Sequence, residues 1–93
     1  MPRVPDDEVQ AALESLPGWA VQDGALAKQF ALPSFLAAVE LVNALASLAE
    51  EANHHPDLDI RYDKVRVALV THSEGGITEK DLQMAQRVEA QQG

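Results

Sequence analysis

Three histidines are the side chains of this sequence best suited to chemistry. They lie in two short segments, His54-His55-Pro56 and Thr71-His72-Ser73, of a 93-residue chain without cysteine. An imidazole titrates near neutral pH, so a group of them favours general acid and base catalysis. Three convergent imidazoles with an open position would also suit a metal ion such as zinc. In a third interpretation the histidines are only polar residues in loops and have no chemical role. This explanation suits a single histidine better than three together.

The first segment is expected to follow the end of a long helix. Pro56 disfavours helical backbone at His55, and Asn53 tolerates the left-handed conformation common just beyond helix ends. Both histidines would then lie in irregular backbone. Glu50, one helical turn before His54, is spaced to orient that ring.

A β-hairpin is expected between the two histidine segments. Residues 58–62 and 65–71 alternate apolar and polar side chains on either side of Asp63-Lys64. The alternation gives the hairpin one shared face, made of Leu58, Ile60, Tyr62, Val65, Val67, Leu69 and Thr71. A two-residue turn brings the open ends of a hairpin together, and here those ends carry the histidines.

Helices and a further hairpin make up the rest of the chain. The patterns predict a helix over 6–16 that stops at Pro17-Gly18, a hairpin of 19–22 with 25–30, a helix over 34–53 and a helix over 78–90. This order predicts an α+β fold: a four-stranded antiparallel sheet with three helices packed on one face, in the order α-β-β-α-β-β-α. So short a chain supports one core, so residues 1–93 are expected to form a single domain.

The first hairpin has a strong turn signal. Asp23-Gly24 supplies the positive φ angles of a two-residue turn, which sets Val21 opposite Leu26. The same register sets Trp19 opposite Lys28, so the ammonium could lie on the indole.

The ends of the later helices carry signals as well. Pro33 suits the first turn of the long helix, and Gly75-Gly76 permits a sharp turn after His72. Thr78 with Asp81 resembles a capping box. The last helix offers four residues to the core: Leu82, Met84, Ala85 and Val88.

The long helix has an unusually wide apolar surface. One stripe consists of Phe35, Ala38, Val39, Val42, Ala46 and Ala49, and a second of Leu41, Leu45 and Leu48. Together they cover roughly half the circumference, against the ~100° typical of a surface helix. Either the helix is wedged into its own core, or the leucine ridge packs on another subunit.

Charge and composition exclude several classes of protein. Fifteen acidic residues against seven Lys and Arg give a net charge of −8, and no basic run is present to neutralise phosphates, so direct nucleic-acid binding is disfavoured. No apolar stretch approaches the ~20 residues that span a membrane, and the first residues do not resemble a signal peptide. We therefore expect a cytoplasmic protein without membrane contact.

The ordered motifs resemble those of the pterin-4a-carbinolamine dehydratase family. Three stretches carry the resemblance: residues 50–56 with His-His-Pro, Tyr62-Asp63-Lys64-Val65, and residues 71–81 with Thr-His and Gly-Gly. Gly18-Trp19 and residues 25–30 extend it over essentially the whole chain. Leu58 stands where many relatives carry an aromatic residue, and Lys28 where arginine is frequent.

The resemblance implies an activity and a set of site residues. Members of the family dehydrate 4a-hydroxytetrahydropterin to quinonoid dihydropterin in tetrahydrobiopterin recycling, with no metal and no cofactor. By carry-over, His54 and His72 would be the acid and base groups, and His55 would bind the pterin and assist proton movement. Pro56, Thr71, Ser73 and Glu74 would line the site, and Glu50 and Asp81 would be supporting carboxylates.

The resemblance also implies partners and an alternative function. The family forms homo-dimers and tetramers, which would place the long helix 34–53 at an interface. Some relatives act as partners of a transcription factor, and others as assembly factors. A non-catalytic interaction module is therefore the alternative to an enzyme acting on a reduced pterin.

Overall fold

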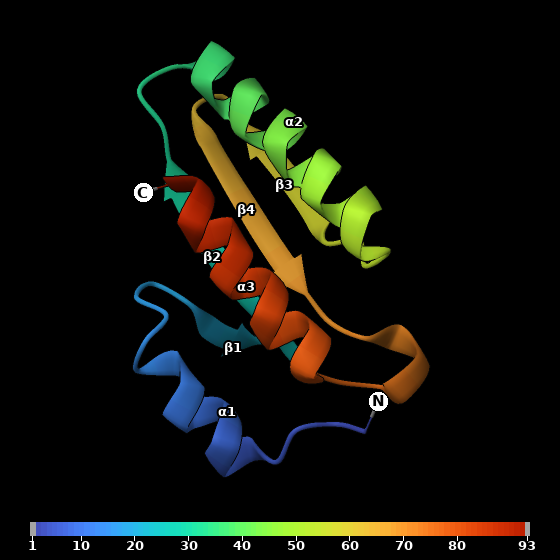
Figure 1. The fold of residues 1–93 in the computed structure, drawn as a ribbon. Coiled ribbons are helices and arrows are strands. Elements are labelled where there is room, and N and C mark those ends of the chain that lie inside the picture. The colour runs from blue at the N-terminus through green and yellow to red at the C-terminus, as the bar shows by residue number, and fades with distance from the viewer. Residues whose placement is uncertain (1, 93) are drawn as a thin grey trace.

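The computed structural model describes residues 2–92 and has the element order predicted from the sequence (Figure 1). The elements are α1 (Asp6–Leu13), β1 (Ala20–Gln22), β2 (Ala25–Ala31), α2 (Phe35–Ala52), β3 (Asp57–Arg61), β4 (Lys64–Leu69), the short 3₁₀ helix η1 (His72–Glu74) and α3 (Glu79–Gln92). The four strands form one antiparallel sheet in the order β1-β2-β4-β3. The predicted α+β class is confirmed.

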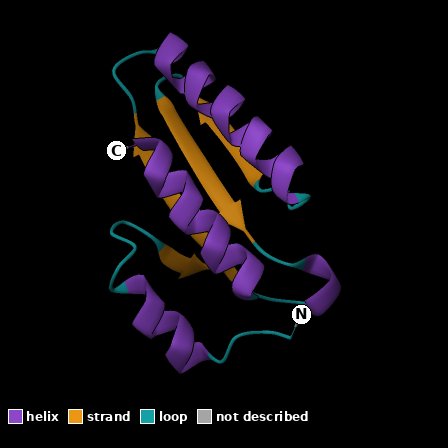
Figure 2. Ribbon diagram, in the orientation of Figure 1, coloured by secondary structure: helices purple, strands orange, loops and turns teal. Residues whose placement is uncertain are grey.

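The helices cover one face of the sheet, as Figure 2 shows for α2 and α3. Their apolar residues and those of the strands form one buried cluster, which also includes Val9 of α1. The core residues predicted for the last helix are all buried: Leu82, Met84, Ala85 and Val88. None of the helices in the described part of the chain is long and apolar enough to cross a membrane.

The first hairpin has the predicted turn and register but a different contact for its lysine. Asp23 and Gly24 both have positive φ angles, and Val21 pairs with Leu26. The ammonium of Lys28 does not lie on an indole; it lies 4.8 Å from the centre of the Phe30 ring. Glu89 of α3 accepts a hydrogen bond from this ammonium at 2.9 Å, which holds it on that side.

Helix α2 begins at a side-chain cap and ends at a residue in the left-handed conformation. The Ser34 hydroxyl accepts a hydrogen bond from the Ala37 N–H at 3.1 Å, so Ser34 is the N-cap. Pro33 therefore precedes the cap, and its predicted place in the first helical turn is wrong. Asn53 has φ 52°, the predicted left-handed conformation at the other end.

The leucine ridge of α2 packs inside this chain. Leu41 and Leu45 are 6% and 1% exposed, and Leu48 is partly buried against the same cluster. The hypothesis that this ridge packs on another subunit is therefore wrong, because α2 lies over β3 and β4 and beside α3. The large exposed apolar residues of α2 are instead at its start, where Phe35 and Leu36 are 53% and 67% exposed.

The second hairpin turns one residue earlier than predicted. Ile60 pairs with Val65 and Arg61 with Lys64, so the turn is Tyr62-Asp63, and Tyr62 has φ 53°. Lys64 belongs to β4 because it also pairs with Ala31 of β2. Tyr62 is 74% exposed and leaves the predicted apolar face.

The turn residue Asp63 has a lowered pKa that can be tested. The Lys64 ammonium donates a hydrogen bond to Asp63 at 2.7 Å, and this bond holds the pKa of the Asp63 carboxyl below its usual value. The stabilisation that Asp63 provides is therefore present above the pKa of the unfolded chain and is lost as pH falls through the folded pKa. We expect Lys64→Met to raise the Asp63 pKa in an NMR titration, and Lys80→Met, remote from this turn, to leave it unchanged. An unchanged pKa in Lys64→Met would contradict the assignment.

The chain then enters α3 through the predicted capping box. The Thr78 N–H donates to Asp81 Oδ2 at 2.8 Å, and the Thr78 hydroxyl accepts from the Lys80 N–H at 3.3 Å. Before it, Gly75 adopts φ 70° at the end of η1, as a sharp turn requires.

Candidate active site

His54 is held by a fully buried carboxylate. Its Nε2 lies 2.5 Å from Asp81 Oδ1, and the two side chains are 12% and 0% exposed. The capping residue Asp81 therefore uses one oxygen to begin α3 and the other to fix an imidazole. A ring bound through Nε2 leaves Nδ1 as the nitrogen that can exchange a proton with a ligand.

The second oxygen of Asp81 ties the site to the end of β4. Asp81 Oδ2 accepts hydrogen bonds from the Thr71 hydroxyl at 2.9 Å and from the Thr78 N–H. The two threonine hydroxyls lie 2.8 Å apart. The carboxylate thus has three partners, which offset the cost of burying it and fix its orientation.

The end of α2 determines where His54 lies. The Asn53 N–H bonds to the Glu50 carbonyl and the His54 N–H to the Ala49 carbonyl, at 3.3 and 3.1 Å. These two bonds, with Asn53 in the left-handed conformation, form a Schellman motif. The motif turns the chain sharply, so that His54 meets Asp81 at the start of α3.

His55 has a different carboxylate. Its Nε2 lies 2.5 Å from Glu50 Oε2, with the two side chains 56% and 78% exposed. The prediction that Glu50 orients His54 is therefore wrong: the chain reverses after α2, and the ring that returns over Glu50 is that of His55. An exposed pair of this kind holds its members much less firmly than a buried one.

His72 lies on the surface at the first position of η1. Its neighbour Thr71 is bonded through Asp81 to His54, so the open ends of the hairpin do lie close together. Within residues 2–92, no hydrogen bond joins the ring of His72 to the other histidines. No set of three or more His, Cys, Asp or Glu side chains in that range is arranged to hold a metal ion, so the three-histidine metal site is not formed there.

A pocket of about 310 Å³ opens beside His54. Its lining consists of Ala52, His54, Lys80, Gln83, Met84 and Arg87. His54 is the one predicted site residue in this lining; Pro56, Ser73, Glu74 and the others lie outside it. Sequence reasoning missed Lys80, Gln83 and Arg87, although their spacing of three and four residues already places them on one face of the last helix.

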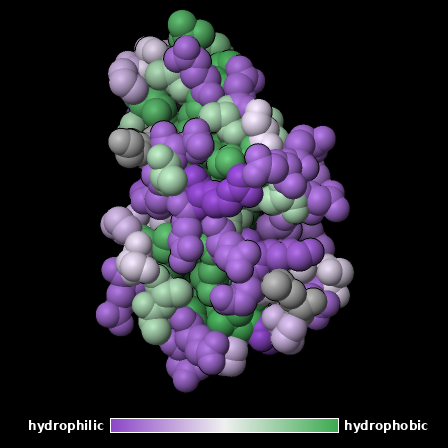
Figure 3. Space-filling model, viewed as in Figure 1, coloured by the Kyte–Doolittle hydropathy of each residue, from purple (hydrophilic) through white to green (hydrophobic). Residues whose placement is uncertain are grey.

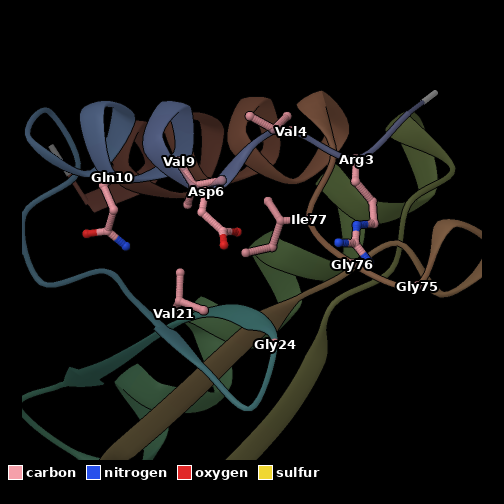
Figure 4. Close-up of a pocket in the computed structure, with 10 residues that line it drawn as sticks. All are labelled: Arg3, Val4, Asp6, Val9, Gln10, Val21, Gly24, Gly75, Gly76 and Ile77. Atoms are coloured by element: carbon pink, nitrogen blue, oxygen red, sulfur yellow. The ribbon is translucent and has the colours of Figure 1, made fainter.

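A second pocket, of about 370 Å³, lies between α1, β1 and the Gly75-Gly76-Ile77 segment. Figure 4 shows Asp6 and Gln10 pointing from α1 towards Val21 of β1. This lining contains none of the histidines. The pocket beside His54 is therefore the better candidate for acid and base chemistry.

The fold and this site define an α+β domain with a carboxylate-supported histidine at a pocket. Residues 2–91 match the family model described as pterin 4 alpha carbinolamine dehydratase, and the chain belongs to that family. A Mycobacterium sp. (strain KMS) protein, provisionally named pterin-4-alpha-carbinolamine dehydratase, is 55% identical over 90% of this chain and 89% of its own. A Herpetosiphon aurantiacus protein with the same provisional name is 49% identical over 96% and 93%.

Two solved structures share the fold. The first, a transcriptional coactivator/pterin dehydratase from Brucella melitensis, has a TM-score of 0.92 at 36% identity, covering 98% of this chain and 99% of its own. The second is a pterin dehydratase-like protein identified as a RuBisCO assembly factor in the alpha-carboxysome. It has a TM-score of 0.69 at 30% identity over 82% of this chain and 90% of its own.

Proposed function

We propose that this protein is a hydro-lyase that dehydrates 4a-hydroxytetrahydropterin to quinonoid dihydropterin and water, as in tetrahydrobiopterin recycling. Family membership supports the reaction class. The observation that carries the proposal is the buried pair of His54 and Asp81 beside a pocket, because it presents one orientated imidazole nitrogen to a ligand.

The reaction needs one acid and one base. The bond between C4a and its hydroxyl oxygen breaks, and the oxygen takes a proton from the acid to leave as water. A ring N–H gives its proton to the base, and its electron pair forms the new C=N bond. No oxidant, metal or cofactor is needed, and paired imidazoles supply both proton transfers.

We assign the acid and base roles to His54 and His72, with His55 binding the pterin and assisting proton movement. Asp81 is a positioning residue for His54, and Glu50 for His55. Pro56, Thr71, Ser73 and Glu74 complete the proposed substrate-binding set. Thr71 supports it through its bond to Asp81.

Stopped-flow measurement of carbinolamine dehydration tests the proposal. The wild-type chain should accelerate dehydration by at least about 10²-fold, the lower end of what a positioned acid or base contributes. A rate equal to that of buffer alone would refute the enzyme assignment. In that case the interaction role would remain.

An interaction role is the alternative. It is favoured by the two solved structures named for coactivator and assembly functions, and by the exposed Phe35 and Leu36. Figure 3 shows apolar residues at the end of the molecule where α2 begins. We also propose a cytoplasmic homo-oligomer with the long helix 34–53 at its interface. The chain retains all three histidines, which favours catalysis over a purely structural role.

A further inference from the structure

The lining of the pocket beside His54 contains two cationic side chains and no carboxylate. The chain has a net charge of −8 and only seven Lys and Arg residues, yet Lys80 and Arg87 both line this pocket. Lys80, Gln83 and Arg87 are spaced to lie along one face of α3. A cationic pocket on an acidic protein attracts and retains anions.

Lys80 has no internal electrostatic partner that accounts for its position. Four of the other cationic side chains pair with carboxylates: Lys28, Arg61, Lys64 and Arg87. The Lys80 ammonium makes no ion pair or hydrogen bond within residues 2–92. It lies in the first turn of α3, where the helix dipole disfavours a cation. The Lys80 side chain is exposed, so its ammonium is available to a ligand.

Arg87 is paired with a carboxylate and still has donors to offer. One of its terminal nitrogens bonds to Glu51 Oε1 at 2.5 Å, which ties α3 to α2. A guanidinium has five N–H donors, so this bond leaves others for a ligand. Met84, which is 3% exposed, and Ala52 are the apolar residues of the same lining.

The pocket therefore has an apolar part beside His54 and cationic groups along α3, a combination that suits a ring carrying an anionic substituent. We propose that this pocket binds a phosphate or carboxylate on the side chain of the substrate pterin, with Lys80 and Arg87 as its ligands. This inference rests on the proposed function and names its substrate class: a reduced pterin with a negatively charged side chain. Binding is the only step involved, and the acid and base groups stay the same.

Three carbinolamines with the same ring test the inference directly. One has a neutral, hydroxylated side chain, the second has the same side chain phosphorylated, and the third has a side chain ending in a carboxylate. Comparison of the second with the third distinguishes the two kinds of anion. Wild-type protein should show a kcat/KM at least about tenfold higher for an anionic substrate than for the neutral one. This preference should decrease as salt is added.

Lys80→Met is the decisive variant. We expect it to lower kcat/KM roughly 10- to 100-fold for the anionic substrate, as loss of a hydrogen bond to a charged group does, and by a smaller factor for the neutral substrate. Lys64→Met is the matched control: it also removes one lysine charge, but at the start of β4 and outside the lining of this pocket, so the preference should persist. Equal values for the neutral and the two anionic substrates in wild type, or equal losses for all three in Lys80→Met, would overturn the inference.

Failure of the proposed function would be recognised separately. If no carbinolamine is dehydrated, binding of the oxidised pterins with and without phosphate can be measured by fluorescence. Tighter binding of the phosphorylated pterin that depends on Lys80 would leave this pocket assignment standing and reject the dehydratase alone. Equal binding of the two pterins would reject the pocket assignment.

Discussion

Joint replacement of His54 and His72 by alanine is expected to lower kcat for carbinolamine dehydration by at least about 10³-fold. Each positioned acid or base contributes typically ~10²–10⁴-fold, and groups that act together give losses that are not additive. The single variants should therefore each lose most of what the double variant loses. Stopped-flow assay of all three variants measures this, and full activity in the double variant would refute the mechanism.

A folding control is needed, because His54 is also the hydrogen-bond partner of the buried Asp81 carboxylate. His54→Ala leaves one oxygen of a buried carboxylate unpaired, at a cost of about 1–3 kcal/mol. His54→Gln can still donate to Asp81 but has no group that titrates near neutral pH. A His54→Gln protein that melts close to wild type yet has lost activity separates the chemical role from the structural one. His72 is exposed, so His72→Ala should melt as wild type does.

Signals that act over a few residues predicted the local structure well. Asn53 and Pro56 predicted the end of α2, and Thr78 with Asp81 predicted the start of α3; both ends have the expected hydrogen bonds. The β4 part of the second hairpin's apolar face is also confirmed, whereas Ile60 and Tyr62 are exposed and the turn moved to Tyr62-Asp63. Moving a two-residue turn by one position shifts the pairing by two, which preserves the face on which each side chain lies.

Contacts between distant segments were not predictable from the sequence. The hairpin register places Lys28 opposite Trp19, but its ion-pair partner, Glu89, is 61 residues away. The side-chain alternation predicts Lys64 in the turn, because its pairing with Ala31 of a distant strand has no local signal. At the site, the carboxylates were identified by resemblance, but which imidazole each one meets depends on the chain reversal after α2.

Asp81→Asn is expected to lower kcat by about 10²-fold or more while leaving the fold largely intact. The buried Oδ2 must still accept from the Thr78 N–H, so the new amide should place its oxygen there and its NH₂ towards His54. An amide donor facing Nε2 forces that nitrogen to become an acceptor, which moves the ring proton to Nδ1. His54 then has the wrong tautomer to act as a base through Nδ1. A similar loss follows the aspartate-to-asparagine change in serine protease triads.

The tautomer distinguishes this explanation from simple destabilisation. Nitrogen-15 NMR of the His54 ring should show the proton on Nε2 in wild type and on Nδ1 in Asp81→Asn. Glu50→Gln makes the same chemical change at the exposed pair with His55, and its loss of activity should be smaller because that carboxylate restrains its ring less. If Asp81→Asn kept both the wild-type tautomer and wild-type activity, Asp81 would be only a helix cap, and the buried pair would not position His54 for catalysis.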